Sequence, residues 1–243
     1  MNNLKLKVWI ITRVNRVINR MLPYDASEEA YSQVYNKFLK AVNNMTDACI
    51  LEVGSRKETN SITQRNRFTS AKEYVGFDYY AGENVDVIGD AHNLSRYLPE
   101  EHYDAVLCMA TFEHLAMPWK TVLEINKVIK KGALVFINTH PAYPPHNRPW
   151  DFWRFQKASF NSLLNEKTGF RIIHCEEGDP ASLVAYNKKT FKAHRSFPKR
   201  IVNLGISVIA EKIGLPDKSL SWEIEVKDMI DGVYPQPNIK NRV

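Results

Sequence analysis

Cysteine is scarce in this sequence and is poorly placed for cross-linking or for structural metal binding. The 243 residues include only three cysteines, which form no C-x-x-C pair: Cys49, Cys108 and Cys175. This argues against a disulfide framework and against a structural zinc site. Free, widely spaced thiols suit the reducing cytoplasm, which is the location we expect. The sequence also lacks any apolar run near the roughly 20 residues that a membrane-spanning helix needs.

Acidic residues are absent from the first 22 positions, where basic and apolar residues follow roughly helical spacing. The basic residues are Lys5, Lys7, Arg13, Arg16 and Arg20, and the apolar residues are Val8, Ile11, Val14, Ile18, Met21 and Leu22. A basic amphipathic helix of this kind can lie on an anionic membrane, which predicts peripheral contact with the inner face of a membrane through residues 1–22. The alternative is a helix that packs on its own domain with its basic face in water. The basic charge matches no nucleic-acid module, so we expect no nucleic-acid partner.

Short runs that are apolar on both faces make up the middle of the chain. They are CILEV (49–53), YVGFD (74–78), VDVI (85–88), DAVLCM (104–109) and ALVFIN (133–138). Such runs are typical of strands buried in a parallel sheet. Helical patterns lie between several of them, most clearly at 118–131, and this alternation predicts an open, doubly wound α/β sheet.

The remaining segments predict how the chain is divided. Two last strands are expected at 170–177 and 182–189, and a helical segment at 200–215. We therefore divide the chain into three parts. These are an N-terminal helical segment (1–45), a cofactor-binding core (46–189) and a partly helical C-terminal extension (190–243).

The turn after the first strand lacks the glycines of a dinucleotide site. Gly54 stands alone there, followed by Ser55 and Arg56, whereas G-x-G-x-x-G would bring bare backbone against a pyrophosphate. The acid Glu52 also disfavours a phosphate at this place. Asp78 ends the second strand, 24 residues beyond Gly54, where an acid typically accepts hydrogen bonds from ribose hydroxyls. A phosphate-free, cationic nucleoside cofactor fits this set, and S-adenosyl-L-methionine has that character.

Five segments together resemble, in order and spacing, the motifs of class I S-adenosylmethionine-dependent methyltransferases. They are ILEVGSR, YVGFD, DVIGDAHNL, YDAVLCMATFEHL and INKVIKKGALVFINTHP, and the resemblance covers about residues 48–188. It is closest to the small-molecule branch found in cell-surface polysaccharide and natural-product pathways. The resemblance implies a Rossmann-like, doubly wound, mostly parallel seven-stranded sheet with helices on both faces and an antiparallel final strand. N-terminal helices and a C-terminal extension would be added to this core.

By position, the resemblance also implies which residues contact the cofactor. In the family, successive sets hold the methionine end, the ribose, the adenine and the underside of the cofactor. The matching sets here are Glu52, Gly54 and Ser55; Asp78 and Tyr79; Asp90 and Ala91; and Met109 and Ala110. One departure concerns the family's E-x-G-x-G-x-G, in which Arg56 and Glu58 replace the later glycines, so this turn must be built differently.

A hydroxyl acceptor needs a base, and two histidines are placed to serve. His114 follows the fourth strand and His146 lies in the loop after the fifth, and either could take a hydroxyl proton. Alternatively, His114 braces the next helix and His146 is a surface residue. We expect no metal. Related quinone-directed methyltransferases use E-x-x-E-H here to bind magnesium, but Ala110 replaces the first glutamate. The pair His140-x5-His146 lacks an evident third ligand.

The loop HPAYPPHNRPWDFWRF (140–155) is too rich in proline for a helix or a central strand. It is also too aromatic for an ordinary solvated loop. Aromatic faces beside polar groups suit sugar rings, and this predicts acceptor contacts from Tyr143, His146, Asp151, Trp153 and Arg154. Alternatively, the loop packs on the sheet with Asp151 paired to Arg154.

The sequence therefore predicts an S-adenosylmethionine-dependent methyltransferase that O-methylates a sugar or glycan intermediate. Two other hypotheses stay open. One is a methyltransferase for another small molecule, such as a natural product or lipid. The other is a catalytically silent S-adenosylmethionine-binding module anchored by its basic N-terminal helix.

Overall fold

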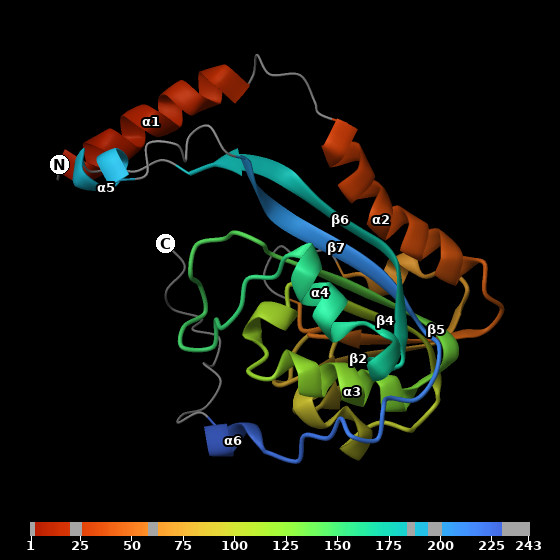
Figure 1. Ribbon diagram of the computed structural model, residues 1–243. Helices are drawn as coiled ribbons and strands as arrows, with labels where there is room; N and C mark the ends of the chain where they lie inside the picture. The colour runs from red at the N-terminus through yellow and green to blue at the C-terminus, as the bar shows by residue number, and fades with distance from the viewer. Residues whose placement is uncertain (1–2, 20–25, 58–62, 184–187, 194–200, 230–243) are drawn as a thin grey trace.

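A seven-stranded sheet forms the centre of the computed structural model, which describes residues 3–19, 26–57, 63–183, 188–193 and 201–229 (Figure 1). The strands are β1 (Ala48–Val53), β2 (Ala71–Asp78), β3 (Val87–Ile88), β4 (Tyr103–Met109), β5 (Ile129–Thr139), β6 (Phe170–Ser182) and β7 (Ile201–Lys212). They lie in the order β3-β2-β1-β4-β5-β7-β6. The last strand, β7, runs antiparallel to both of its neighbours, and the other pairs of this sheet are parallel. This arrangement confirms the predicted Rossmann-like class.

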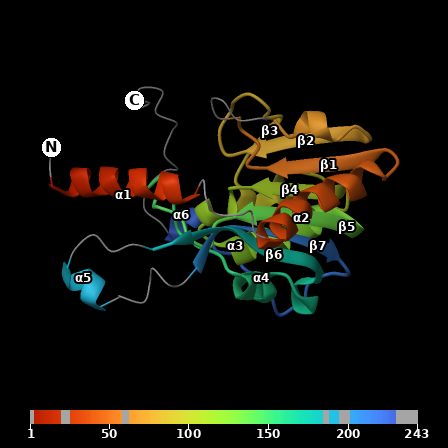
Figure 2. The same cartoon turned by 90° about the horizontal axis from the view of Figure 1, so that it is seen from above.

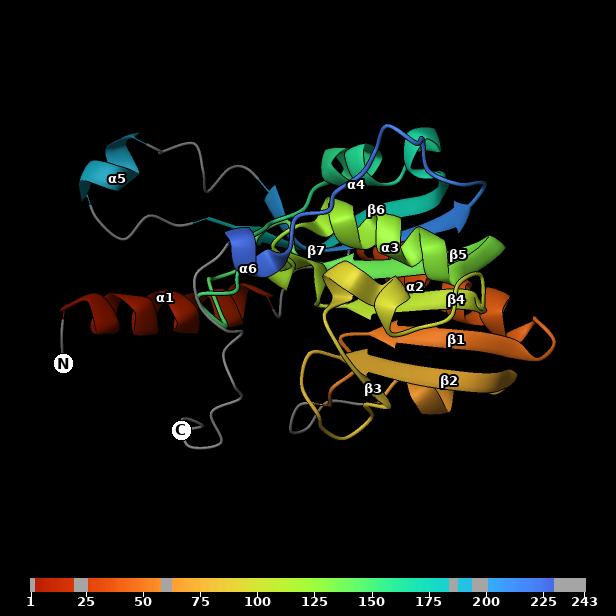
Figure 3. The same cartoon turned by 90° about the horizontal axis from the view of Figure 1, so that it is seen from below.

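Helices cover both faces of the sheet, as seen from below in Figure 3. One face carries α2 (Ala26–Asn43), and the other carries α3 (Pro118–Val128), α4 (Lys157–Leu163) and the 3-10 segment η2 (Ala91–Arg96). Every residue of β1 is buried. Because both faces are covered, the inner strands have no polar side, which explains the continuous apolar runs in the sequence.

Apolar side chains fix each layer to the sheet. On one face Phe38 of α2 stacks on Phe136 of β5 with ring centroids 5.3 Å apart. On the other face Val122 and Ile125 of α3 belong to the cluster that contains Leu51 of β1. This double layer leaves the carboxyl ends of the parallel strands as the place where loops can form a site.

The strand β7 corrects the prediction of a helix at 200–215. Its residues 205–210 are buried between β5 and β6, and they include the β-branched Ile206, Val208 and Ile209. An apolar run buried on both faces has no period by which a strand can be distinguished from a helix. Because β7 lies inside the sheet, the core does not end at residue 189.

Other boundaries also differ from the sequence analysis. The predicted strand at 182–189 is wrong, because β6 ends at Ser182 and α5 spans Lys188–Ala193, while residues 184–187 lie outside the described part. The helix predicted at 118–131 ends at Val128, and the next residues begin β5. Of the predicted extension, the described residues after β7 include one short helix, α6 (Val226–Met229).

The N-terminal helix α1 (Asn3–Asn19) lies apart from the sheet in all three ribbon views and is clearest in Figure 2. Its described apolar side chains face solvent, with Trp9 54% and Val17 61% exposed; Ile11 is partly covered. The alternative of a helix packed on its own domain is therefore not what the structure shows. Within the described residues, no helix is both long and apolar enough to cross a membrane.

Candidate active site

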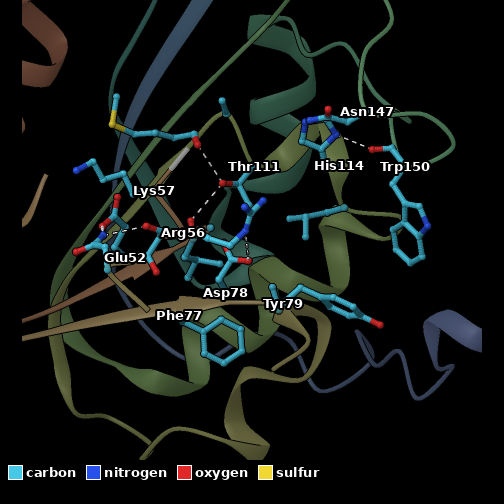
Figure 4. Close-up of a pocket in the computed structure, with 18 of the residues that line it drawn as sticks. Glu52, Arg56, Lys57, Phe77, Asp78, Tyr79, Thr111, His114, Asn147 and Trp150 are labelled. Carbon is cyan, nitrogen blue, oxygen red and sulfur yellow. Dashed lines mark hydrogen bonds and ion pairs between the residues drawn. The ribbon is translucent and has the colours of Figure 1, made fainter. Parts of the chain in front are cut away.

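A cavity of about 480 Å³ lies where β1, β2 and β4 end, at the edge that the fold class favours for ligands. Figure 4 shows Glu52 and Asp78 on one side of it and His114 and Trp150 on the other, with Thr111 between them. Every residue assigned to the cofactor by the sequence lines this cavity: Glu52, Gly54, Ser55, Asp78, Tyr79, Asp90, Ala91, Met109 and Ala110. The structure thus gathers residues from four strand ends around one space.

Glu52, at the end of β1, is a buried carboxylate with two hydrogen-bond donors. Tyr74 Oη lies 2.7 Å and Asn84 Nδ2 lies 2.8 Å from its Oε2. Burial raises the pKa of Glu52, although both donors oppose that rise. Burial and the nearby Glu52 charge raise the pKa of Tyr74 far above its ordinary value, so the phenol keeps its proton and donates it. The carboxylate is thereby held against the cavity wall.

The turn after β1 brings the backbone close to the cavity at Gly54. Gly54 has a φ of +79°, which L side chains rarely adopt. A Cβ atom there would lie 2.1 Å from Thr111 Oγ1. The N–H groups of Gly54 and Ser55 donate to the Phe77 carbonyl at 2.9 and 3.1 Å, which ties this turn to β2. Ser55 Oγ is buried and has no hydrogen-bond partner among the described residues, so it is a polar atom suited to a bound ligand.

Arg56 shows how the turn forms without the later glycines of the family pattern. Its N–H donates to Asp78 Oδ2 at 3.0 Å, and its Nε lies 3.7 Å from Asp78 Oδ1. The aliphatic part of the side chain lies over Gly82, where a Cβ atom would come within 2.7 Å of Arg56 Cγ. The turn therefore accommodates a large side chain because β2 and Gly82 provide a charge partner and space.

Asp78 is fixed at the end of β2 by backbone amides. Besides the bond from Arg56, Tyr80 N–H donates to Oδ1 at 3.1 Å. Each carboxylate oxygen can accept two hydrogen bonds. One accepting position per oxygen is used by these amides, and two ribose hydroxyls could fill the others.

Asp90 and His92 form a second polar pair at the start of η2, where Asp90 is the residue just before the 3-10 segment. Asp90 Oδ1 accepts from His92 N–H at 2.9 Å and lies 2.6 Å from His92 Nδ1. Met117 N–H donates to His92 Nε2 at 3.2 Å, so the ring proton sits on Nδ1. Burial acts to raise the pKa of Asp90, but the bonds from His92 outweigh it, and the net effect is a lowered pKa. Asp90 is therefore an anionic acceptor beside the cavity.

The histidines gather at the opposite end of the cavity. The 3-10 turn η3 (Phe112–His114) follows β4 and buries both Glu113 and His114. His114 Nδ1 lies 2.5 Å from the Trp150 carbonyl oxygen, and the His114 and His146 rings are 4.8 Å apart. Both line the cavity, as does His140, whose ring stacks on Tyr143 at 4.2 Å. The alternative of an isolated surface position for His146 does not match this packing.

Three residues predicted to contact the acceptor do not line the cavity. The Asp151 side chain is 2% exposed, and both of its oxygens bind Arg154, at 2.6 and 2.9 Å. Hydrogen bonds from Arg154 strongly lower the pKa of Asp151, although burial of the carboxylate opposes this shift. Trp153 Nε1 donates to the Leu115 carbonyl at 2.9 Å. These three side chains hold the loop together, and the Asp151–Arg154 pair is the one that the alternative interpretation of the loop predicted.

Hydrogen bonds of Asp151 and Arg154 within the loop also position other loop residues beside the cavity. His146 N–H donates to Asp151 Oδ2 at 2.8 Å, and Arg154 Nε donates to the Tyr143 carbonyl at 3.1 Å. Tyr143 and His146, which the sequence analysis assigned to the acceptor, line the cavity together with Asn147 and Trp150, which it did not name. Nothing in the sequence pattern separates these inward residues from the residues that brace the loop.

Comparison with known proteins identifies the family. Residues 11–174 match the family described as methyltransferase domain. A protein of Bacillus halodurans C-125 described as a methyltransferase has a TM-score of 0.54 at 16% identity, covering 75% of this chain and 100% of its own. A SAM-dependent methyltransferase of Archaeoglobus fulgidus has a TM-score of 0.51 at 16% identity, covering 77% of this chain and 95% of its own. The YcgJ protein of Bacillus subtilis has a TM-score of 0.52 at 14% identity, covering 77% of this chain and 99% of its own. A comparison with curated proteins found no significant match.

The residues present fit S-adenosylmethionine. The cavity offers Asp78 to a diol, Asp90 to an amine and the unpartnered Ser55 Oγ to a further polar group. It also offers the acid Glu52 to a cation, and Gly54 lets the backbone approach. The match extends over most of the chain, and the sheet has the order and direction described above. The chain therefore belongs to the methyltransferase domain family, has the Rossmann-like fold of class I S-adenosylmethionine-dependent methyltransferases, and takes S-adenosylmethionine as its cofactor.

Proposed function

We propose that this protein transfers the methyl group of S-adenosylmethionine to a hydroxyl group of a sugar or glycan intermediate. The proposal rests on the side chains that line the end of the cavity opposite Glu52 and Asp78. There Tyr143 and Trp150 supply flat faces, while His114, His146 and Asn147 supply polar atoms. Aromatic faces stack on the C–H faces of a sugar ring, and the polar groups can bind its hydroxyls.

Four residues of the cofactor end would orient S-adenosylmethionine so that its methyl group faces the histidines. Asp78 would accept from the ribose hydroxyls, Asp90 would accept from the adenine amine, and Glu52 and Gly54 would lie beside the methionine portion. When bound, the cofactor supplies an electrophilic methyl group whose bond to sulfur breaks as the acceptor oxygen bonds to carbon, leaving a neutral thioether. Holding the two reactants in line accounts for much of the rate enhancement of such a displacement.

The proton of the acceptor hydroxyl would pass to a histidine. His114 Nδ1 faces the Trp150 carbonyl, which can only accept, so the proton of the neutral ring sits on Nδ1. Its Nε2 then carries the lone pair needed to take a proton. His146 Nδ1 lies 3.2 Å from the Pro144 carbonyl oxygen, a longer contact that favours the same position for the ring proton.

Histidine substitution combined with a substrate screen tests this proposal. Transfer of a labelled methyl group would be measured over nucleotide sugars and glycans, and then for His114→Ala and His146→Ala with the acceptor found. We expect one or both variants to lower kcat by at least about tenfold, since a positioned base contributes about 10² or more. His102→Ala, on the surface beside Glu73, is the matched control. Unchanged turnover in both cavity variants would rule out a histidine base.

A second acceptor class is favoured by the size of the aromatic surface. Tyr79, Tyr143 and Trp150 all line the cavity, and Tyr79 and Trp150 lie 6.4 Å apart. A planar natural product or the apolar part of a lipid would also pack between such rings. The screen should therefore include phenolic and lipid acceptors, and methylation of these instead of sugars would replace the glycan assignment. If the cofactor binds and every acceptor fails, the silent-module hypothesis gains support.

We further propose that α1 attaches the protein to an anionic membrane surface. Leu6, Ile10, Val14 and Val17 follow helical spacing along one face and are exposed. Basic residues and no acids accompany them in the helix: Lys5, Lys7, Arg13 and Arg16. An apolar stripe with positive charge beside it is complementary to anionic lipid, and each basic residue near such a surface contributes about 1 kcal/mol.

Liposome flotation checks the membrane proposal. The full chain should float with vesicles of phosphatidylcholine mixed with an anionic phospholipid, and this binding should fall as salt rises. Vesicles of phosphatidylcholine alone should bind several-fold less. A chain starting at residue 26 should stay at the bottom of the gradient, while a Lys192→Ala variant, with its change in α5, should float like the full chain. Equal flotation with and without residues 1–25 would contradict the proposal.

A further inference from the structure

Four ionisable side chains from two parts of the chain lie together at the acceptor end of the cavity, which three of them line. Glu113 and His114 come from η3, and His140 and His146 come from the loop after β5. One ligand atom from each of Glu113, His114 and His146 lies within 4.8 Å of the other two. His140 Nε2 lies 3.5 Å from Glu113 Oε1. The fold thus groups His146 with Glu113 and His114 as possible ligands, a set that differs from the His140–His146 pair considered from the sequence.

We propose that Glu113, His114 and His146 bind one divalent metal ion of the zinc class, with a coordination position open toward the acceptor. The set of two imidazoles and one carboxylate is a donor set used by catalytic zinc, which keeps its fourth position for water or substrate. Imidazole donors favour zinc and its transition-metal neighbours, whereas magnesium and calcium prefer oxygen ligands throughout.

The histidines are oriented as metal ligands usually are. The Nδ1 atoms of His114, His140 and His146 lie 2.5, 3.0 and 3.2 Å from the carbonyl oxygens of Trp150, Leu204 and Pro144. A carbonyl only accepts, so each Nδ1 keeps its proton and each Nε2 carries the free lone pair. Metal-bound histidines characteristically donate the other ring N–H to a carbonyl or a carboxylate in this way.

The environment of the Glu113 carboxylate is the strongest single observation in favour of a bound cation. Its side chain is fully buried, and Oε2 accepts from Thr139 Oγ1 at 2.7 Å. The other oxygen, Oε1, has no hydrogen-bond donor among the described residues. Leaving a buried carboxylate oxygen unpaired is costly, and a bound cation removes that cost. His140 Nε2, 3.5 Å from Oε1, is the competing partner for this oxygen.

The geometry requires only a small contraction. Ligand atoms around a tetrahedral zinc ion with bonds near 2.1 Å lie roughly 3.4 Å from one another. The present separations are within 4.8 Å, and the His146 side chain is 27% exposed at the cavity mouth, so its ring can rotate inward. Glu113 is fixed more firmly, because its backbone carbonyl accepts from Phe152 and Trp153 N–H groups at 2.9 and 3.3 Å.

Metal binding would change the proton chemistry described above. With an ion in place, the imidazoles hold the metal instead of taking the proton. An acceptor hydroxyl on the open position would lose its proton to solvent water more readily, because the cation lowers the pKa of that hydroxyl. This consequence rests on the proposed methyl transfer, whereas binding of the ion does not.

Direct metal binding tests the inference. Chelator-treated full-length protein would be titrated with zinc by calorimetry and with cobalt(II) by visible absorption, which reports tetrahedral nitrogen and oxygen ligands. We expect one ion per chain, and at least tenfold weaker binding for Glu113→Gln and for His146→Ala. The matched control is His102→Ala, in the separate cluster of Cys49, Glu73 and His102. It should leave the affinity unchanged.

The outcomes separate this inference from the proposed function. No zinc binding by the wild-type chain, or loss of zinc in His102→Ala with retention in His146→Ala, would overturn the metal site. If Glu113→Gln does not fold, His146→Ala alone decides, because its side chain lies at the cavity mouth. Binding of S-adenosylhomocysteine is measured on the same metal-free samples. Intact cofactor binding and methyl transfer without zinc would remove the metal from the reaction and leave the proposed function standing, while the titrations alone decide whether the ion binds.

Discussion

Replacement of Asp78 by alanine is expected to weaken binding of S-adenosylmethionine and of S-adenosylhomocysteine by at least about 100-fold. Asp78 is the acid at the end of β2, and two backbone N–H groups hold its carboxylate in place. Hydrogen bonds to a charged group contribute about 1.5–3 kcal/mol each, and two ribose hydroxyls would make two of them. A hundredfold change in the dissociation constant corresponds to about 2.7 kcal/mol.

Isothermal titration calorimetry measures this directly, with the wild-type chain expected to bind in the micromolar range. Asp78→Asn keeps the shape of the side chain and loses its charge, so it should fall between the wild type and Asp78→Ala. Asp217→Ala is the control, because Asp217 is an exposed aspartate beyond β7 that binds Ser219. An Asp78→Ala protein that is folded and binds the cofactor normally would remove Asp78 from the site.

The second large effect is expected for Gly54→Ala, which should abolish cofactor binding and lower thermal stability. A Cβ atom at Gly54 would lie 2.1 Å from Thr111 Oγ1 and 2.9 Å from Thr111 Cγ2. The φ of +79° adds backbone strain of about 1 kcal/mol for a residue other than glycine. Relief of the clash with Thr111 and of the backbone strain would move the turn that carries Ser55 and Arg56 away from Asp78.

Gly132→Ala separates steric contact from backbone strain. Gly132 has a similar φ of +85°, but a Cβ atom there would have no atom within 4 Å. We expect this variant to lose about 1 kcal/mol of stability from the strained φ and to bind S-adenosylhomocysteine as the wild type does. Thermal unfolding and calorimetry would be run on both variants. Equal effects of the two substitutions would show that the close approach to Thr111 has no importance for the site.

The cofactor end was readable from the sequence because its residues are fixed by local rules. An acid or glycine that directly follows a buried strand must lie at the carboxyl edge of a parallel sheet. Glu52, Gly54 and Asp78 follow that rule, and all three line the cavity. The fold class could be predicted for the same reason, since apolar runs alternate with helical patterns.

The last strand and the acceptor loop could not be read in this way. In β7 both faces are buried by partners from elsewhere in the chain, so its apolar run has no diagnostic period. In the loop, Asp151 and Arg154 have the composition of a ligand site, but they bind each other. His140, Asn147 and Trp150 line the cavity without any local signal.

The sequence by itself determined the first five strands, the cofactor and the strand ends that carry it, because each depends on residues that are close in the chain. Only the tertiary structure decided which loop residues face the cavity and which ones hold the loop. Only the tertiary structure also brought Glu113 to His146, 33 residues further along the chain. The physical reason is that a carboxylate and an imidazole can act together only when the folded chain buries them close to each other. Their spacing along the sequence encodes neither that separation nor that burial.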